Sequence, residues 1–391
     1  MINNKKVLGI IAEYDPFHNG HKLHIDEARK KSNADYVCII QSGPFMQRGS
    51  LSMFSPHDRA YMAVQNGADI VFEMPVLFSI SDAYRFAFGG VSILDKLNFV
   101  DFISFACEDN DLETLTKISE LLEEDSFHAN VKDYLVDGNS YAYAQGMVIR
   151  DALGSKAYNI FCKSNNILAI CYLRAIKKLE SKITPILIKR KSTHLTNSLN
   201  SFSPSATPIR ENICCGNIHD AISCIPDKTK KYLLNLILEN KINRNELPSD
   251  AIMLKAVSAN NDTLYALPGV SEGLENKIVR EIKKSKDYSD LIQNIKSRRY
   301  TLSRIKRAMV YLLLDVNKKT LEEYNDPKFC KLLAYNKKGA DLLSYPNSNI
   351  KIIKKPEDTN EIEYKKDLLA YKIWQITAQY PDYKVFQIKK I

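Results

Sequence analysis

Short apolar runs alternate with amphipathic segments through the first half of the chain. The runs are rich in Val, Ile and Phe, as expected of buried strands, and they cover residues 7–12, 35–41, 68–73, 99–106 and 183–188. Apolar residues between these runs recur at helical spacing and predict helices after residue 20 and over 55–67, 81–97 and 111–122. This alternation is typical of a doubly wound α/β sheet with right-handed crossovers.

Helical spacing dominates the second half of the chain. Helices are predicted over residues 228–240, 250–259, 274–286 and 302–314. Two short strands and a closing helix are expected at residues 328–333, 349–353 and 365–376. We therefore expect two domains, an α/β domain over residues 1–215 and a mainly helical domain over residues 216–391.

Length and composition favour a protein of the cytoplasm. At 391 residues the chain can form two or three domains with sizeable cores. It has no run of about 18 apolar residues and no charged-then-apolar leader, so we expect a soluble cytoplasmic protein without a membrane segment. The eight cysteines include no C-x-x-C pair and no metal-ligand spacing, so we expect reduced thiols and no metal site.

Charge is distributed unevenly along the chain. The net charge is +9 overall, −8 over residues 1–160 and therefore +17 over residues 161–391. A basic region of this size is the usual footprint of a nucleic-acid backbone, because lysine and arginine gain by releasing condensed counterions. A merely lysine-rich composition, with the charges solvated on helix faces, is the alternative. No protein partner can be inferred from the sequence.

The densest basic stretch lies at residues 277–307, where Tyr300 stands among many lysines and arginines and three acidic residues. Exposed on helix faces, such a stretch would meet the phosphates of an RNA. The residues that we select as candidates for this contact are Lys283, Lys284, Arg298, Arg299, Arg304, Lys306 and Arg307.

The most informative stretch follows the first predicted strand. A polar turn with Asp15-Pro16 leads into His18-Asn19-Gly20-His21, which opens a predicted helix. In a parallel sheet this order places two imidazoles and a glycine at a helix amino terminus on the carboxyl edge, where N–H groups bind anions. The stretch therefore predicts a phosphate site, although two histidines at this spacing are also common on ordinary helix surfaces.

Two loops follow other predicted strands and so belong to the same carboxyl edge. Gln47 and Arg48 lie in a glycine-bracketed loop after residues 35–41, and Arg190 follows residues 183–188. Both positions suit side chains that line a ligand crevice. A surface ion pair is the alternative for Arg48.

Two predicted helix starts carry polar side chains. Asn165 and Asn166 open an amphipathic helix, with Ser164 or Asn165 as the expected N-cap. Thr207 is the expected N-cap of a second helix, because Pro208 follows it at the first helical position. Helix starts of this kind can serve as caps only or can present donors to an anion.

These motifs resemble those of one enzyme family. The His-x-Gly-His element resembles the signature of the HxGH nucleotidyltransferase superfamily, and residues 13–21 look more specifically like the bacterial tRNA(Met) cytidine acetate ligases. Residues 42–49 resemble that family's SGxFxQRG stretch, and residues 205–210 resemble the superfamily's S-x-T-x-x-R signature. Relatives usually have asparagine in place of Asp15 and a glycine near Ala106.

The resemblance implies site residues as well as a fold. The fold would be a Rossmann-like nucleotidyltransferase domain with ATP as co-substrate, followed by a basic tRNA-binding domain, to which the seven basic residues above would belong. His18, His21 and Arg210 would be catalytic, and Gln47 and Arg48 would lie in an active-site loop. The residues implied to bind ATP are Ile11, Ala12, Glu13, Tyr14, Asp15, Pro16, Phe17, His18, Asn19, Gly20, His21, Lys22, Leu23, His24, Ala106, Asn165, Asn166, Arg190, Ser205 and Thr207.

The implied reaction has two steps. Acetate, already ionised near neutral pH, would attack the α-phosphorus of ATP without a general base, and the histidines and Arg210 would stabilise the phosphates. The acetyl-adenylate would then acylate the exocyclic amine of the wobble cytidine of elongator tRNA(Met). Mg²⁺ usually accompanies ATP, but no residue pattern predicts a ligand set for it.

Two other functions fit parts of the sequence. A small-metabolite adenylyltransferase, of the pantetheine-phosphate or nicotinamide-mononucleotide type, would share the phosphate motifs but would not need the basic second half. A non-catalytic RNA-binding protein on the same fold would not need His18, His21 and Arg210. The ligase is therefore the function that we expect.

Overall fold

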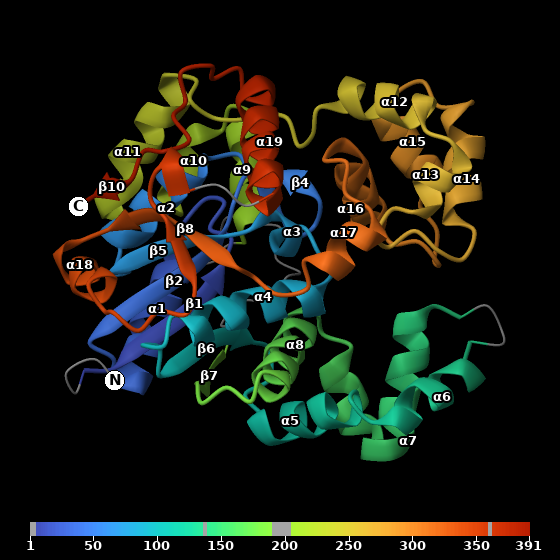
Figure 1. Cartoon of the computed structure of the whole chain (residues 1–391), viewed down its shortest axis with the longest axis horizontal. Helices are drawn as coiled ribbons and strands as arrows, with labels where there is room; N and C mark the ends of the chain where they lie inside the picture. Colours follow the sequence, from blue (N-terminus) through green and yellow to red (C-terminus); the bar gives the residue numbers. More distant parts are fainter. Residues whose placement is uncertain (1–4, 136–138, 190–204, 359–361) are drawn as a thin grey trace.

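A sheet of mostly parallel strands forms the centre of the computed structural model, which describes residues 5–135, 139–189, 205–358 and 362–391 (Figure 1). Its strands are β1 (Val7–Ala12), β2 (Tyr36–Ser42), β5 (Ile70–Met74), β6 (Phe102–Cys107), β7 (Thr184–Lys189), β8 (Phe329–Tyr335), β9 (Lys351–Ile353) and β10 (Lys389–Lys390). The order is β10-β8-β5-β2-β1-β6-β7, with β9 also paired to β8. The run from β5 to β7 is parallel and doubly wound, which confirms the predicted fold class.

The two faces of the sheet bury alternate residues of the same strands. In β2, Tyr36, Cys38 and Ile40 face one core, whereas Val37 and Ile39 face the other. A strand that is covered on both faces must be apolar at successive positions. This explains why the predicted strands appear in the sequence as continuous apolar runs rather than as alternating patterns.

Helices cover both faces of the sheet. Those of the first 238 residues are α1 (Asn19–Ser32), α2 (Pro56–Gln65), α3 (Val76–Ser79), α4 (Ala83–Lys96), α5 (Leu112–Leu121), α6 (Asp125–Asp133), α7 (Tyr141–Phe161), α8 (Ser164–Lys178), α9 (Ala206–Cys214), α10 (Ile218–Ser223) and α11 (Asp227–Leu238). α4 and α8 lie on one face, and α1, α2 and α11 lie on the other. Gly90 lets α4 approach β1 closely, because a Cβ there would come within 2.5 Å of Ile11.

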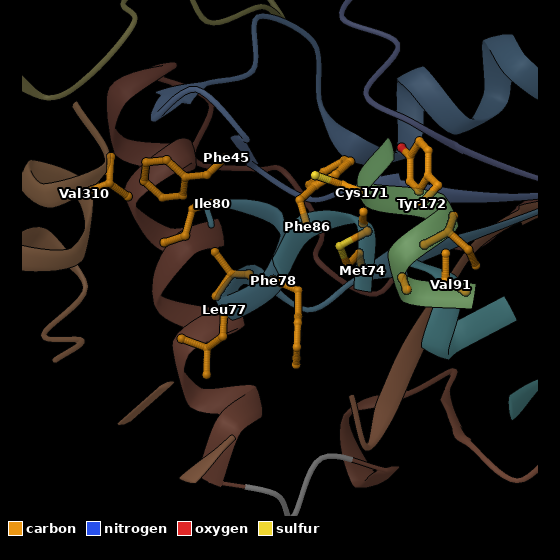
Figure 2. Close-up of a cluster of buried hydrophobic side chains, with 14 of the residues drawn as sticks. Phe45, Met74, Leu77, Phe78, Ile80, Phe86, Val91, Cys171, Tyr172 and Val310 are labelled. Atoms are coloured by element: carbon orange, nitrogen blue, oxygen red, sulfur yellow. The ribbon is translucent and has the colours of Figure 1, made fainter. Parts of the chain in front are cut away.

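A helical module, residues 249–323, lies to one side of the sheet (Figure 1). It contains α12 (Ser249–Ser258), α13 (Asn261–Tyr265), α14 (Leu274–Ile282), α15 (Tyr288–Ile295), α16 (Leu302–Leu313) and α17 (Lys318–Glu323). The module packs on a short hairpin of β3 (Phe45–Met46) and β4 (Ser50–Leu51). Figure 2 shows Val310 of α16 facing Phe45 and Ile80. The hydrophobic core of the module is continuous with the core on one face of the sheet.

The chain then returns to the sheet. After the module, β8 pairs antiparallel with β5, and β9 and β10 pair parallel with β8. α18 (Lys337–Leu343), the 3₁₀ turn Pro356–Asp358 and α19 (Ile362–Thr377) complete this part. The sheet therefore continues past the division expected at residue 215, because β8 pairs with β5, far back in the chain, and β9 and β10 add to β8. The mainly helical part of the second half is the module, not everything after residue 216.

Several local predictions differ from the structure. The helices that were not predicted are α3, α6, α7, α10, α13, α15, α17 and α18. α9 begins at Ala206, so Ser205 occupies the N-cap position expected for Thr207. Lys163 likewise takes the N-cap position expected for Ser164 or Asn165. Helix ends depend on which neighbouring groups satisfy the terminal N–H donors, and the sequence shows this only locally.

Candidate nucleotide-binding site

A cavity of about 430 Å³ lies at the carboxyl edge of β1, β6 and β7. This is the volume of a small-ligand site and large enough for a nucleotide. β1 is central, with β2 on one side and β6 and β7 on the other, so the cavity has two ends flanking the β1–α1 turn. Predicted site residues on its wall are Ile11, Ala12, Glu13, Tyr14, Asp15, His18, Gly20, His21, Leu23, His24, Gln47, Arg48, Ala106, Asn165 and Arg210.

The two signature histidines are held in one arrangement by backbone donors. His18 is the N-cap of α1, and its Nδ1 accepts a hydrogen bond from Gly20 N–H at 3.1 Å. His21 Nδ1 accepts from His18 N–H at 3.3 Å, and the two rings stack with centroids 3.6 Å apart. Because each Nδ1 is an acceptor, the proton of each neutral ring lies on Nε2. Both rings therefore carry an N–H donor in a wall formed by a helix amino terminus.

The loop between β1 and α1 is anchored through Asp15. Its carboxylate accepts hydrogen bonds from Met53 N–H at 2.9 Å and Phe54 N–H at 3.0 Å. The Arg210 guanidinium donates to the Asp15 carbonyl oxygen at 2.6 Å and lies 3.9 Å from the carboxylate. Each carboxylate oxygen has its own backbone donor, so aspartate suits this position. Arg210, which belongs to the stretch that resembles S-x-T-x-x-R, thereby contacts the loop that precedes the His-x-Gly-His motif.

Arg59 of α2 fixes the same loop from the protein interior. It is fully buried, and its guanidinium donates to the carbonyl oxygens of Glu13, Ser42, Gly43 and Phe54. These bonds connect the ends of β1 and β2 to the start of α2. Desolvation lowers the pKa of Arg59, and the carboxylates of Asp15 and Glu13 oppose that shift. Arg59 was not among the predicted site residues, because nothing local in the sequence distinguishes it from a surface arginine.

One end of the cavity, which we call the β2 end, is formed by Glu13, the hairpin and the start of α4. Glu13 Oε1 accepts from Gln47 N–H at 2.7 Å, and the Gln47 side chain donates to Ser81 O at 2.8 Å. Arg48 lies exposed at the mouth. Residues of this end that were not predicted are Met46, Ser50, Ala83 and Phe86.

The opposite end, the β7 end, is formed by β6, β7 and the start of α8. Asn165 lies on its wall and donates to Glu108 Oε1 at 3.0 Å. Asn166 is fully buried, accepts from Glu108 N–H at 2.9 Å and donates to Ile160 O at 3.0 Å. Of the two candidate asparagines, Asn165 is the one placed to meet a ligand, whereas Asn166 joins β6 to α8.

Unpredicted side chains complete the β7 end of the cavity. Lys189 ends β7 and is exposed on the wall. Buried Tyr172 also lines the cavity, with its ring 5.1 Å from that of Phe105. Lys189 stands beside the predicted Arg190, which lies outside the described residues together with residues 191–204. The remaining unpredicted lining residues are Ile10, Glu27, Ser164, Leu168, Ile188 and Ala206.

Several residues of the implied ATP set have internal partners instead of a place on the wall. Phe17 is buried in the core, and Pro16 is buried beside it. Asn19 donates to carbonyl oxygens of residues 223 and 224, and Lys22 pairs with Asp26. These residues shape the turn around the histidines.

The remaining members of that set divide between the wall and its surroundings. His24 does reach the cavity, but its Nε2 bonds to Ser104 Oγ at 2.9 Å. Ser205 precedes α9, and Thr207 is exposed and accepts from Arg210 at 3.3 Å. All of these stay predictions as nucleotide contacts.

The seven basic candidates divide into two groups. Lys283, Lys284, Arg298 and Arg299 are exposed on the helical module. Arg304, Lys306 and Arg307 are half-buried, and two of them have anion partners: Arg304 binds Glu272 at 3.1 Å, and Lys306 pairs with Glu246. Desolvation lowers the pKa of Arg307. The first group is available to a phosphate backbone, whereas Arg304 and Lys306 of the second group are engaged in ion pairs with the protein.

No cluster of His, Cys, Asp or Glu with metal-binding geometry occurs among the described residues. None of the described helices combines the length and apolarity required to span a bilayer. The described cysteines are thiols, five of them buried.

A doubly wound sheet with a His-x-Gly-His helix start at its carboxyl edge defines the class of HIGH nucleotidyltransferases. The family model for the HIGH nucleotidyl transferases matches residues 5–387. The tRNA(Met) cytidine acetate ligase of Thermoanaerobacter sp. (strain X514) is 36% identical over 381 residues, 95% of each chain, and that of Caldanaerobacter subterraneus is 34% identical over 99% of this chain and 98% of its own. The chain belongs to the tRNA(Met) cytidine acetate ligase family within the HIGH nucleotidyl transferases.

Solved structures agree with this assignment. TmcAL from Thermotoga maritima in its apo form is similar with a TM-score of 0.91 and 27% identity, covering 99% of this chain and 100% of that one. Its structure bound with alpha-thio ATP is similar with a TM-score of 0.88 and 26% identity over the same shares.

Proposed function

We propose that this chain is an ATP-dependent ligase that acetylates the exocyclic amine of the wobble cytidine in elongator tRNA(Met), giving N4-acetylcytidine. The observation that carries the proposal is the meeting of His18, His21 and Arg210 around one cavity, in a chain whose relatives are ligases of this name. Acetate and ATP would form acetyl-adenylate and pyrophosphate, and tRNA would accept the acetyl group with release of AMP.

The first step requires charge stabilisation and alignment rather than an enzyme base. Acetate is an anion near neutral pH, and its attack on the α-phosphorus concentrates negative charge on phosphate oxygens. The N–H groups at the start of α1 and the two imidazoles would stabilise that charge, and Arg210 would hold the departing pyrophosphate. Lys189 would add positive charge at the β7 end, and the phosphate contact predicted for Arg190 stays a prediction.

We assign the two ends of the cavity to different substrates, with the sheet order as support. Ala106 and Asn165, which the family resemblance associates with ATP, both lie at the β7 end. The phosphates would lie at the start of α1, next to β1. The acyl group and its acceptor would therefore approach from the β2 end, between Glu13, Gln47 and the hairpin.

The helical module adjoins this β2 end. Gly49 of the hairpin abuts the α16 backbone, since a Cβ there would come within 2.6 Å of Arg307 N. Leu51 N–H donates to Glu246 O at 2.7 Å, and Tyr311 contacts Ser81 Oγ at 3.1 Å. A tRNA bound to the exposed lysines and arginines of the module could thus reach the acceptor end. The anticodon loop would turn the cytidine outward to deliver its amine.

Mg²⁺ would take its ligands mainly from ATP and water. The Asp15 carboxylate oxygens are both occupied by backbone donors, and one Glu13 oxygen is occupied too. Mg²⁺ in nucleotide sites commonly uses phosphate oxygens and water in this way. A tRNA-modifying enzyme of this kind would work in the cytoplasm.

Pyrophosphate exchange tests the proposal directly. We expect exchange between ATP and labelled pyrophosphate to depend on acetate, and labelled acetate to be transferred to elongator tRNA(Met). Exchange or pyrophosphate release that depends instead on nicotinamide mononucleotide or pantetheine phosphate would show a small-metabolite adenylyltransferase. Binding of tRNA without either reaction would show a non-catalytic RNA-binding protein.

A further inference from the structure

We propose that the Glu13 carboxylate is the general base of the transfer step, accepting the proton that the exocyclic amine of the cytidine loses when it is acetylated. This inference rests on the proposed function. It assigns a role to a cavity carboxylate that the formation of the adenylate does not require.

The chemistry of the second step calls for a proton acceptor. The amine nitrogen attacks the acetyl carbonyl carbon, so that a C–N bond forms while the C–O bond to AMP breaks. AMP leaves with that electron pair as an anion and needs no proton. The attacking nitrogen becomes positively charged and must release one proton, which Glu13 would accept and pass to solvent. A positioned base typically contributes roughly 10²–10⁴-fold to such a step.

Glu13 lies where the amine must arrive. It directly follows β1 and lines the β2 end of the cavity, next to the turn that carries His18 and His21. Gln47 N–H donates a hydrogen bond to Glu13 Oε1 at 2.7 Å, and the Arg59 guanidinium donates to the Glu13 carbonyl oxygen. The carboxylate is therefore fixed by one oxygen and by its backbone, as a base that must meet a bound substrate should be.

The other carboxylates of the cavity wall are less suited to this role. Both oxygens of Asp15 accept backbone N–H groups, and Arg210 lies beside them. Glu27 lies on α1 one turn before Lys31, which donates to Leu187 O of β7. Glu27 therefore lies toward the β7 end of the cavity, away from the acceptor.

The electrostatic surroundings of Glu13 support the assignment. Burial raises the pKa of its carboxyl group above the usual range, and Asp15 adds to this effect. The Gln47 N–H, Arg210 of α9 and Arg59 of α2 act in the opposite direction. The remaining upward shift brings the pKa of the Glu13 carboxyl group closer to the working pH, which improves a base.

The test isolates the transfer step by supplying synthetic acetyl-adenylate and tRNA to the enzyme in a single turnover. In Glu13→Gln the amide oxygen can still accept from Gln47 N–H but cannot take the proton. We expect transfer to fall by roughly 10²–10³, and Glu13→Asp to recover part of the rate. Glu113→Gln, an exposed carboxylate of α5, is the matched control and should transfer like the wild type.

The pH dependence provides a second readout that a purely structural role would not change. The pH–rate profile of the wild type should have a limb along which the transfer rate rises as Glu13 loses its proton, at a pH above the ordinary glutamate range. Glu13→Asp should keep this limb of the profile, and Glu13→Gln should lose it. His18 and His21 are retained in these variants, so any limb that they contribute persists. Near-wild-type transfer by Glu13→Gln, or an unchanged limb, would overturn the inference. Absence of acetate-dependent exchange in the wild type would instead overturn the proposed function.

Discussion

Positive side chains of the sheet region and of the helical module are used differently. In the sheet region Arg59 and Lys331 are buried, Arg59 against carbonyl oxygens and Lys331 at 3.6 Å from the Glu73 carboxylate. In the module Arg298 and Arg299 are exposed to solvent. Burying a charge is costly unless it is paired, whereas an exposed charge keeps its hydration until a partner arrives.

The difference separates charges that build the site from charges that can meet a substrate. Arg59 donates hydrogen bonds to the loops after β1 and β2 from the protein interior, and its side chain is not exposed to solvent. Arg298 and Arg299 contribute little to the fold and are accessible to an RNA backbone. Arg304 and Lys306 lie in the module but behave like the first kind, because each has an anion partner. Removing a buried arginine such as Arg59 should therefore destabilise the fold, whereas removing an exposed one such as Arg298 should mainly weaken RNA binding.

The largest effect is expected from Arg59→Met. This change leaves several buried carbonyl oxygens without a donor, and loss of a buried charge network costs roughly 3–5 kcal/mol of unfolding free energy. Urea unfolding would measure it. Arg298→Met is the matched control, and its cost should stay within about 0.5 kcal/mol, as for ordinary surface substitutions. Equal losses in the two variants would contradict the distinction between buried and exposed arginines.

His21→Ala tests the catalytic side of the comparison. Removing one donor that stabilises transition-state charge should lower acetate-dependent pyrophosphate exchange by roughly 10²–10³. His18→Ala should behave alike, whereas tRNA affinity should hardly change because the exposed basic residues lie on the module. His24→Ala, which removes a ring bonded to Ser104, should cost far less. Exchange near the wild-type rate in His21→Ala would remove the histidines from the mechanism.

Lys331 makes the stability of the sheet region depend on pH. Burial lowers the pKa of this ammonium from 10.5 to about 8, and Glu73 limits the shift. Between about pH 8 and about pH 10.5 the folded chain releases the proton while the unfolded chain keeps it. Wild-type stability should therefore rise relative to Lys331→Met across this window, by on the order of 1 kcal/mol per pH unit at most.

Unfolding midpoints of the wild type and Lys331→Met across that pH window would measure the difference. The exposed Lys283→Met serves as the control from the module and should show no such slope. A wild-type advantage that falls with rising pH would contradict the assigned direction of the pKa shift.

The smallest effect in free energy is expected from the double variant Arg298→Glu with Arg299→Glu. Two reversed charges should weaken tRNA binding by roughly tenfold and reduce the salt slope by about one for each lost phosphate contact. Acetate-dependent exchange should persist, since the phosphate motifs lie in the sheet region. Titrations at several salt concentrations would show this. Lost exchange with an unchanged tRNA slope would assign these residues to the fold of the catalytic region.

The sequence by itself determined the parts of the fold and site that depend on near neighbours. β1, β2, β5, β6 and β7 were all predicted, because strands covered on both faces must be apolar throughout. The place of the His18–His21 turn at the carboxyl edge of the sheet was predicted, because a strand, a glycine and a helix start within a few residues define it, and its binding of phosphate stays a prediction. The family assignment rests on the same local motifs and is confirmed.

Only the tertiary structure decided which residues are buried, paired or brought together. Nothing near Lys331 in the sequence shows that its strand returns to pair with β5 beside Glu73, and nothing near Arg59 shows its four carbonyl partners. The choice of Asn165 over Asn166 depends on Glu108, which lies at the end of another strand. Burial and pairing are set by contacts between distant segments, and the free energy of a charge depends on those contacts rather than on its sequence neighbours.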